Sequence, residues 1–266
     1  MANFSPTSTI SLAENGAYTV IEKPIEIRTP DGTADGFLIQ PEKEGRWPGI
    51  IQLTDIGGIR RTSKDMAARQ ASAGYIVLLP NIFYRTHKAP IFSEPIIFGD
   101  ENFAKRVTEL RQALPLEAQD RDVPAYVDFL ANQPSVKGNA FGVVGYCFAG
   151  AMVLRTAAAR PDQIAAAASF HGGGLYTDAP TSPHTLLPHV KARLYFGHAT
   201  DDRSMPKEAI EKFDRALAAW GGRYESEVYP AHHGWTVRDN PSYDEPQAER
   251  AFKKLTQLFA ETLNPK

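Results

Sequence analysis

The chain contains one cysteine, and its sequence context is that of a reactive side chain. Cys147 lies in the segment GYCFAG, residues 145–150, directly after an apolar run. A nucleophile flanked by small residues at these spacings is typical of a sharp strand-to-helix turn that exposes the central side chain above a sheet. A thiolate held in such a turn can attack a carbonyl carbon. The alternative is an inert thiol buried in the core, which is common for free cysteines.

Two other groups could complete a catalytic site with this thiol. The pairs Asp201-Asp202 and His232-His233 each follow a predicted strand further along the chain. The order nucleophile, acid, histidine is the order found in α/β-hydrolases. In such a triad the imidazole takes or returns the thiol proton, while the carboxylate fixes the imidazole tautomer and stabilises its charged form. The order alone leaves both members of each pair open.

The elements that must position these groups alternate between strands and helices. From Pro48 onwards, apolar runs alternate with amphipathic segments, which is typical of a parallel sheet covered by helices. An antiparallel hairpin is predicted before them, at residues 25–28 and 36–39. The later strands are predicted at 49–53, 75–80, the residues up to 145, 164–170, 193–197 and 224–229. The helices are predicted at 64–73, twice between 102 and 132 with a break near Pro115, up to about 160, and at 207–220 and 246–263.

This pattern predicts an α/β fold with a mostly parallel central sheet, helices on both faces and an antiparallel N-terminal hairpin. Ligands of open α/β sheets bind at the carboxyl ends of the strands, which is where the thiol, the acids and the histidines are found. A chain of 266 residues with 42% hydrophobic residues can bury one large core. We expect one domain over residues 21–266, preceded by an N-terminal extension over residues 1–20.

Composition limits the partners of the protein. A formal net charge of -2 provides no broad basic field, so nucleic acid and anionic membrane surfaces are unlikely partners, and we expect a small molecule instead. One cysteine cannot form an internal disulfide, and the first residues lack the pattern of a secretion signal. No apolar segment approaches the ~18 residues of a membrane span. We therefore expect a cytoplasmic protein, and no feature of the sequence specifies an oligomeric state.

Cofactor signals are weak throughout the chain. Gly145 and Gly150 have the spacing of a phosphate-binding loop, but Ala151-Met152 follow where that loop needs Lys and Ser/Thr. The seven histidines show no metal-binding spacing. The run His171-Gly172-Gly173-Gly174 is similar to an oxyanion motif of lipases, but it comes after the nucleophile, so we interpret it as a turn. No metal and no cofactor are expected.

At the thiol, the acids and the histidines, the chain resembles the dienelactone hydrolase family, the cysteine-dependent branch of the α/β-hydrolases that opens carboxymethylenebutenolides. The resemblance spans most of the chain, from the first hairpin to the last helix. The family's G-[YF]-C-x-G-G turn corresponds to residues 145–150, with Ala149 in place of one glycine. The family's acid stands four residues before a proline, which selects Asp202. Its histidine precedes a small and an aromatic residue, which selects His233.

The resemblance also implies roles for residues around the triad. Asp55 stands where the family has the glutamate that activates the thiol, and is shorter by one methylene. The backbone N–H groups of Ile56 and Phe148 are implied to form the oxyanion hole. The residues implied to contact substrate are Arg85, Trp235 and Arg238; the alternative for the two arginines is a solvated or salt-bridged position.

Together these features predict a cysteine-dependent hydrolase of a lactone or carboxylic ester, working through Cys147, His233 and Asp202 and an acyl-enzyme. One alternative is a general carboxylesterase or thioesterase. Another is a non-catalytic protein on the same scaffold that uses the thiol to bind a ligand or sense oxidants. The segment 88–102, with Phe92, Ile96, Ile97 and Phe98, is expected either as an apolar lid or as ordinary packing under a long loop.

Overall fold

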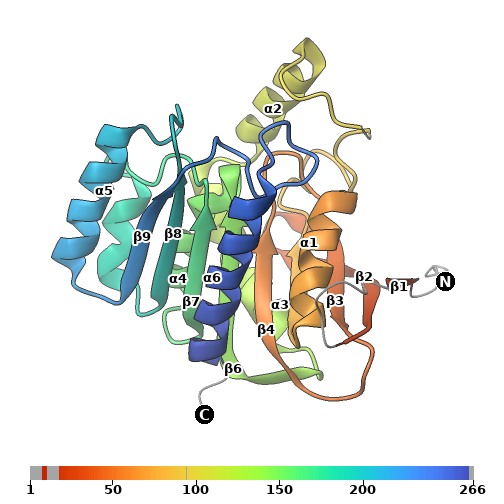
Figure 1. Ribbon diagram of the computed structural model, residues 1–266. Coiled ribbons are helices and arrows are strands. Elements are labelled where there is room, and N and C mark those ends of the chain that lie inside the picture. The colour runs from red at the N-terminus through yellow and green to blue at the C-terminus, as the bar shows by residue number, and fades with distance from the viewer. Residues whose placement is uncertain (1–7, 11–17, 94, 264–266) are drawn as a thin grey trace.

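A single sheet of nine strands organises the protein (Figure 1). The computed structural model describes residues 8–10, 18–93 and 95–263. The strands lie in the order β1-β2-β3-β5-β4-β6-β7-β8-β9. Their bounds are β1 (Ser8–Ile10), β2 (Val20–Thr29), β3 (Gly32–Pro41), β4 (Trp47–Leu53), β5 (Ile76–Pro80), β6 (Val136–Tyr146), β7 (Ile164–Phe170), β8 (Arg193–Ala199) and β9 (Tyr224–Tyr229).

Strand direction divides this sheet into two parts. The strands β1, β2, β3 and β5 pair antiparallel, and the predicted hairpin is formed by β2 and β3, whose register runs from Val20 opposite Pro41 to Thr29 opposite Gly32. From β5 through β4 and β6 to β9, every neighbouring pair is parallel. Parallel strands end on one edge, so the loops after β4, β6, β7, β8 and β9 lie together there.

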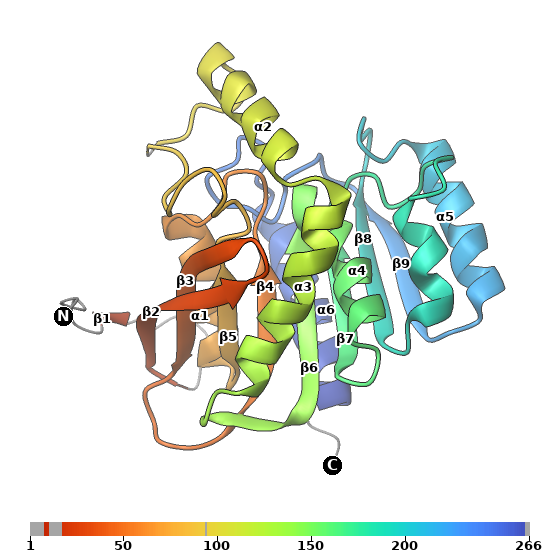
Figure 2. The ribbon, with the colours of Figure 1, turned by 180° about the vertical axis from the view of Figure 1, so that it is seen from behind.

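Helices cover both faces of the sheet, as expected for parallel strands joined by crossovers. The helices are α1 (Arg61–Ser72), α2 (Glu101–Ala113), α3 (Leu116–Ala131), α4 (Met152–Ala159), α5 (Lys207–Trp220) and α6 (Glu245–Leu263), with 3₁₀ turns η1 (Cys147–Gly150) and η2 (Pro183–His189). One face carries α1 and α6 (Figure 1), and the other carries α3 and α4 (Figure 2). The predicted α/β-hydrolase architecture is confirmed.

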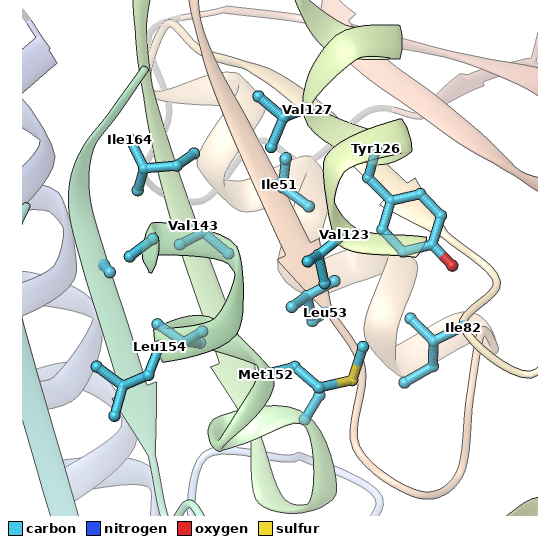
Figure 3. Close-up of a cluster of buried hydrophobic side chains, with 14 of the residues drawn as sticks. Ile51, Leu53, Ile82, Val123, Tyr126, Val127, Val143, Met152, Leu154 and Ile164 are labelled. Carbon is cyan, nitrogen blue, oxygen red and sulfur yellow. The ribbon is translucent and has the colours of Figure 1, made fainter. Parts of the chain in front are cut away.

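Two hydrophobic cores fill the spaces between the sheet and the helices. Successive residues of a strand point to opposite faces, so Val143 joins the core under α3 and α4 while Val144 joins the core under α1 and α6. The same alternation separates Ile51 from Ile50 on β4. Figure 3 shows the first core, where side chains of β4, β6 and β7 meet those of α3 and α4. The central strands are therefore buried on both sides.

One helix departs from this layered arrangement. The helix α2 projects beyond the carboxyl edge of the sheet, where the strand ends converge (Figures 1 and 2). It ends at Ala113, and α3 begins at Leu116 with Pro115 as its N-cap, which confirms the predicted break. The chain between β5 and α3 thus lies above the carboxyl ends of the strands.

Two short elements were not predicted from the sequence. The strand Ser8–Ile10 pairs with β2 at the edge of the sheet, within the segment expected as an N-terminal extension. The other element is η2. Residues 1–7 and 11–17 of that extension lie outside the described residues, and the division into extension and domain stays a prediction. Within the described ranges, no helix combines the length and apolar character needed to cross a membrane.

Candidate active site

The sheet register brings the predicted catalytic loops together. Leu53 of β4 pairs with Gly145 of β6, which pairs with Ser169 of β7. The next strands continue the series, with Phe170 of β7 beside Gly197 of β8. Beyond β8, Thr200 donates its backbone N–H to the carbonyl of Ala231 at 2.8 Å, which ties the acid loop to the histidine loop. Residues remote in sequence therefore meet at one edge.

A tight turn presents Cys147 at this edge. The cysteine has a φ of 52°, a left-handed conformation that non-glycine residues adopt rarely, and it begins η1. A Cβ at Gly145 would lie 2.5 Å from the carbonyl oxygen of Ala149, and one at Gly150 would lie 2.4 Å from the Cα of Gly172. Glycine is needed at both positions because the backbone passes too closely for a side chain.

Backbone strain is concentrated around this site. Among the described non-glycine residues, those with positive φ are Cys147, His171 and Asp201. They follow β6, β7 and β8 respectively, so each is at the carboxyl end of a neighbouring strand. Strained residues of this kind cost free energy and persist where the surrounding structure fixes them, often at functional sites. Their grouping marks this edge as a candidate active site.

A chain of short contacts joins the thiol, an imidazole and a carboxylate. The Nε2 atom of His233 lies 3.0 Å from the Sγ atom of Cys147. The other ring nitrogen, Nδ1, lies 2.6 Å from Oδ2 of Asp202. The neighbouring residues Asp201 and His232 are exposed and make no such contact within the described part of the chain. The geometry thus selects Asp202 and His233 from the two pairs.

The carboxylate of this group is held from a second side by Ser204. Both the backbone N–H and the hydroxyl of Ser204 donate to Oδ1 of Asp202, at 2.8 and 2.6 Å. Burial favours protonation of Asp202, but the hydrogen bonds from His233 and Ser204 outweigh it and keep its pKa below the ordinary value. Asp202 is therefore ionised and fixed in orientation. No role was predicted for Ser204, whose backbone N–H closes an Asx-type turn on Asp202.

The two partners of His233 set its charge. Burial alone would lower the pKa of His233, but its hydrogen bonds to Asp202 and to Cys147 outweigh that effect and raise the pKa to about 10. At neutral pH the ring is therefore an imidazolium placed between a carboxylate and a sulfur atom.

A second imidazole lies behind the first. The ring of His171 is fully buried 5.1 Å from the ring of His233, and its Nε2 atom lies 2.7 Å from Oγ1 of Thr236. Burial and the nearby charge of His233 keep the pKa of His171 well below its usual value, so it is neutral. Trp235, implied as a substrate contact, is also fully buried and packs on Tyr229 and His171. In this structure Trp235 supports the histidine loop and offers no surface to a substrate.

The carboxylate implied to activate the thiol is engaged elsewhere. Arg60 donates to both oxygens of Asp55, at 2.6 and 2.9 Å, and to both oxygens of Asp239, at 2.7 and 2.9 Å. Asp55 also accepts the backbone N–H of Gly57 at 3.0 Å. Among the described residues, Asp55 makes no hydrogen bond to Cys147. Thiol activation by Asp55 stays a prediction, and it would require the carboxylate to leave the buried Arg60.

The position of Asp55 nevertheless matters for the loop that follows β4. Its bonds to Gly57 and Arg60 fix the backbone around Ile56, which was implied to form half of the oxyanion hole. The other half, Phe148, follows Cys147 directly. Because β4 and β6 are adjacent parallel strands, these two loops are neighbours at the carboxyl edge. The fold is compatible with the implied pair of donors.

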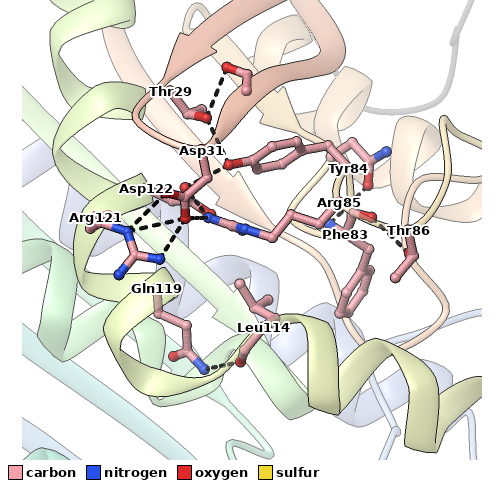
Figure 4. A network of polar contacts seen from close by, with 12 residues as sticks. Thr29, Asp31, Phe83, Tyr84, Arg85, Thr86, Leu114, Gln119, Arg121 and Asp122 are labelled. Carbon is pink, nitrogen blue, oxygen red and sulfur yellow. Dashed lines mark hydrogen bonds and ion pairs between the residues drawn. The ribbon is translucent and has the colours of Figure 1, made fainter.

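Arg85 is salt-bridged, which is the alternative to substrate binding that the sequence left open. Its terminal nitrogens donate to both oxygens of the fully buried Asp122, at 2.7 and 2.8 Å, and to Asp31 at 2.6 Å (Figure 4). The hydroxyl of Tyr84 donates to the same carboxylate at 3.0 Å. Both terminal nitrogens are thus engaged by protein groups. A role of Arg85 in substrate binding stays a prediction that this network does not favour.

One exposed cation lies near the side chain of Phe148, and another was implied as a substrate contact. Arg111, in the last turn of α2, is exposed, and its guanidinium lies 5.4 Å from the centre of the Phe148 ring. No ion pair of Arg111 occurs in the described part of the chain. Arg238, implied as a substrate contact, is exposed, and its guanidinium lies 6.0 Å from the centre of the Tyr243 ring. No role was predicted for Arg111, because only the folded position of α2 brings it near Phe148.

The segment 88–102 packs against α2. The rings of Phe92 and Phe98 lie 5.3 and 5.2 Å from that of Phe103, while Ile97 is 65% exposed. Together the segment and α2 line a cavity of about 550 Å³. Residue 94 lies outside the described residues. The segment therefore has packed aromatic side chains, as expected for ordinary packing under a loop. It also has one exposed apolar side chain, as expected for a lid.

The site residues themselves offer no metal centre. Throughout the ranges that the structure describes, no three histidine, cysteine, aspartate or glutamate side chains are grouped so as to hold a metal ion. What the site offers is a sulfur nucleophile, an imidazole and a fixed carboxylate.

Known proteins share both the sequence and the fold. The model of the dienelactone hydrolase family matches residues 34–263. A Synechocystis protein provisionally named a carboxymethylenebutenolidase is 28% identical over 228 residues, covering 84% of this chain and 90% of its own. The carboxymethylenebutenolidase of Rhodococcus opacus is 28% identical over 221 residues, covering 81% and 82%.

Solved structures agree with this assignment at the level of fold. A Klebsiella pneumoniae protein assigned to the dienelactone hydrolases superposes with a TM-score of 0.77 at 21% identity, over 91% of this chain and 98% of its own. Identity this low shows a shared fold and no more.

Proposed function

The chain belongs to the dienelactone hydrolase family, and we propose that this hydrolase of ester or lactone bonds uses Cys147 as nucleophile, His233 as acid and base, and Asp202 to orient His233. The single observation that carries the proposal is the contact series from sulfur to imidazole to carboxylate, at 3.0 and 2.6 Å. A nucleophile, a base within hydrogen-bond reach and a third group that orients the base are the signature of covalent catalysis.

The first half of the reaction forms a thioester. The thiolate of Cys147 attacks the carbonyl carbon, and the electron pair of the C=O bond moves to oxygen. The backbone N–H groups of Ile56 and Phe148 donate to that oxyanion. When the tetrahedral intermediate collapses, the C–O bond to the leaving group breaks and His233 gives its Nε2 proton to the departing alkoxide. A raised pKa of about 10 supports this role, because the imidazolium is present at neutral pH.

The second half returns the enzyme to its starting state. Once sulfur is acylated it carries no negative charge, and the contribution of Cys147 to the raised pKa of His233 is lost. The neutral imidazole then takes a proton from water, whose oxygen attacks the thioester carbonyl. Collapse of the second intermediate releases the carboxylic acid, and the proton on His233 remains opposite the regenerated thiolate. The same contact thus serves acid and base steps in turn.

Two arginines bear on the charge of the preferred substrate, and they point in opposite directions. The network around Arg85 favours the alternative of a general carboxylesterase, because its terminal nitrogens are already paired. The exposed guanidinium of Arg111 near Phe148 favours a substrate that carries a carboxylate. Turnover of 4-nitrophenyl hemisuccinate and of neutral 4-nitrophenyl valerate separates the two: Arg111→Ala should raise KM for the first ester alone. An equal effect on both esters would contradict a charge-specific role.

The direct test of the nucleophile is the turnover of 4-nitrophenyl esters and dihydrocoumarin by Cys147→Ala. We expect loss of activity by several orders of magnitude, since the residual rate comes from binding and the oxyanion hole alone. Undiminished turnover would overturn the mechanism. Cys147→Ser is a weaker test because serine can act on the same scaffold.

A further inference from the structure

The helices α1 and α6 lie on one face of the sheet (Figure 1), and residues of both line a second cavity. Its volume is about 490 Å³, within the range of about 300–1,000 Å³ that is typical of small-molecule sites. Both helices contribute walls, and Tyr146 and Phe170 contribute from the ends of β6 and β7. Cys147 is not among its lining residues. His233 and Asp202 do not line it either, whereas Arg238, one of the implied substrate contacts, does.

Most of the charged groups around this cavity are already paired. Arg69 of α1 donates to both carboxylate oxygens of Glu249 on α6, at 2.7 and 2.5 Å. The guanidinium of Arg238 lies 6.0 Å from the centre of the Tyr243 ring, and Tyr243 and Glu245 raise its pKa. The lining contains three carboxylates and two guanidinium groups, so it has no surplus of positive charge. The carboxylates outnumber the guanidinium groups, so a bound anion would lose its hydration beside a net negative charge, and anions are therefore disfavoured.

The interior of the cavity is apolar and aromatic. The rings of Tyr146 and Phe170 stack with centroids 5.9 Å apart and an interplanar angle of 18°. Met66 of α1 and Leu255 of α6 add aliphatic surface, and Ala251 leaves space between them because its side chain is short. Such a lining favours a ligand with an apolar body, and the volume of about 490 Å³ has room for more than one ring.

Two polar atoms that line this cavity make no hydrogen bond within the described residues. Tyr146 is only 6% exposed and lines this cavity and the narrow gap beside Asp55, and its hydroxyl makes no hydrogen bond among the described residues. Burial raises the pKa of Tyr146, so the group is a neutral phenol. The Oε1 atom of Gln70, another lining residue, is also buried without a partner. The buried Oε1 atom of Gln70 costs free energy while it lacks a donor, and a ligand hydroxyl that donates to it would recover that cost.

We propose that the cavity between α1 and α6 is a binding site for a small uncharged molecule with an apolar, ring-containing body and a hydroxyl group. The apolar body would lie beside Ala251, and the hydroxyl would bond to Gln70 Oε1 or to the phenol of Tyr146. Because Tyr146 directly precedes Cys147, an occupant would contact the residue that leads into the turn of the nucleophile. The site is independent of the proposed hydrolysis mechanism.

The test uses benzyl alcohol as the probe, on ¹⁵N-labelled protein whose Cys147 has been blocked with iodoacetamide. Blocking the thiol removes binding at the active site from the measurement. We expect saturable NMR shifts at residues 62–72 and 245–255, with Kd in the millimolar range or tighter. Ala251→Met should weaken binding at least 10-fold by filling the cavity, and Tyr146→Phe should weaken it about 3- to 10-fold. Benzoate, the anionic analogue, should bind at least 10-fold more weakly than benzyl alcohol.

The matched control is Ala260→Met, the same change at an exposed position of α6, which should leave Kd unchanged. If Ala251→Met does not give a native spectrum, Ala248→Met fills the cavity from the same helix and replaces it. The proposal is overturned if benzyl alcohol gives no saturable shifts at α1 and α6. It is also overturned if a folded cavity-filling variant binds with the wild-type Kd, or if benzoate binds as tightly as benzyl alcohol.

Discussion

At the scale of single residues, the charge of His233 depends on both of its neighbours. Asp202 and Cys147 each raise its pKa against the opposing effect of burial, to about 10. The folded protein therefore favours the imidazolium. Its stabilising contribution is fully present below the unfolded pKa of about 6.5 and is lost as pH rises through about 10. Catalysis that uses this proton should decline over the same upper range.

We predict that an NMR titration of ¹³C-labelled histidine will give His233 a pKa near 10 in the wild type and a lower pKa in Cys147→Ala, because the contact with sulfur is lost. Asp202→Asn should lower the pKa as well, because the carboxylate charge is removed. His171 is the internal control and should stay neutral, since it is fully buried. An unchanged pKa of His233 in Cys147→Ala would show that sulfur and imidazole do not interact in solution.

At the scale of elements, the turn between β6 and α4 depends on close backbone approach. A Cβ at Gly145 would meet the carbonyl oxygen of Ala149 at 2.5 Å and a methyl group of Val153 at 2.7 Å. These contacts are shorter than van der Waals distances, so the turn would have to open. The geometry of Cys147 is therefore coupled to the absence of a side chain two residues earlier.

Gly145→Ala should lower the free energy of unfolding by about 1–3 kcal/mol and reduce kcat, because the thiol moves away from His233. Urea unfolding and ester turnover measure the two effects. Gly138→Ala is the comparison: its φ of 73° carries backbone strain, but no atom lies within 4 Å of the added Cβ. It should cost stability without affecting kcat. Wild-type turnover in a folded Gly145→Ala protein would refute the coupling.

The loops after β4 and β9 are joined by the buried Arg60. It lies between Asp55 and Asp239, which are 184 residues apart in the chain. Removing one member of a buried ion pair leaves an uncompensated charge, which costs about 3–5 kcal/mol.

We therefore expect Arg60→Met to lower the free energy of unfolding by about 3–5 kcal/mol in urea titrations. Arg60→Met combined with Asp55→Asn should recover part of the loss, because one unpaired carboxylate is neutralised. Arg61→Met, which alters the exposed neighbouring arginine, is the control and should have a small effect. If Arg60→Met were as mild as Arg61→Met, the network would not hold the loops.

Elements were predictable where local pattern determines them. The predicted bounds of β7, α5 and β9 agree with the structure, because each is a single apolar run or amphipathic segment between clear breaks. The strand Ser8–Ile10 was missed because three residues carry no period, and its formation depends on pairing with β2. The placement of β5 between β3 and β4 is likewise a property of the sheet and not of either strand alone.

The residues of the site were likewise predictable only where a local sequence pattern identifies them. The order of Cys147, Asp202 and His233 along the chain pointed to a triad before its geometry was known, and the contacts at 3.0 and 2.6 Å agree with it. The pairings of Arg60 with Asp239 and of Arg85 with Asp122 had no local signal, because charged side chains in loops have many candidate partners. Those pairings decide which charged residues remain available to a substrate.

At the scale of the whole molecule, buried histidines make stability depend on pH. His198 is 1% exposed, and burial lowers its pKa to about 4. A histidine with a lowered folded pKa stabilises the protein fully above the unfolded pKa of about 6.5, and this contribution is lost as pH falls toward 4. His171, which is also buried and neutral, acts in the same direction.

We predict that the free energy of unfolding falls by about 2–3 kcal/mol through His198 alone between pH 7.5 and 4.5. Urea unfolding at the two pH values measures the total change. His198→Gln keeps a neutral polar side chain near Ser226 and should have a smaller pH dependence by about that amount. Identical pH dependence in His198→Gln and wild type would show that His198 does not remain neutral in the folded protein.

The central claim is that Cys147 becomes acylated during turnover. Rapid mixing with 4-nitrophenyl valerate, acid quenching within one turnover and mass spectrometry of the peptide that contains Cys147 test it directly. We predict a transient mass increase equal to one valeryl group, absent from Cys147→Ala and longer-lived in His233→Ala if that variant still acylates. Product release with an unmodified Cys147 peptide at every quench time, or a peptide that carries only oxidised sulfur, would contradict the account.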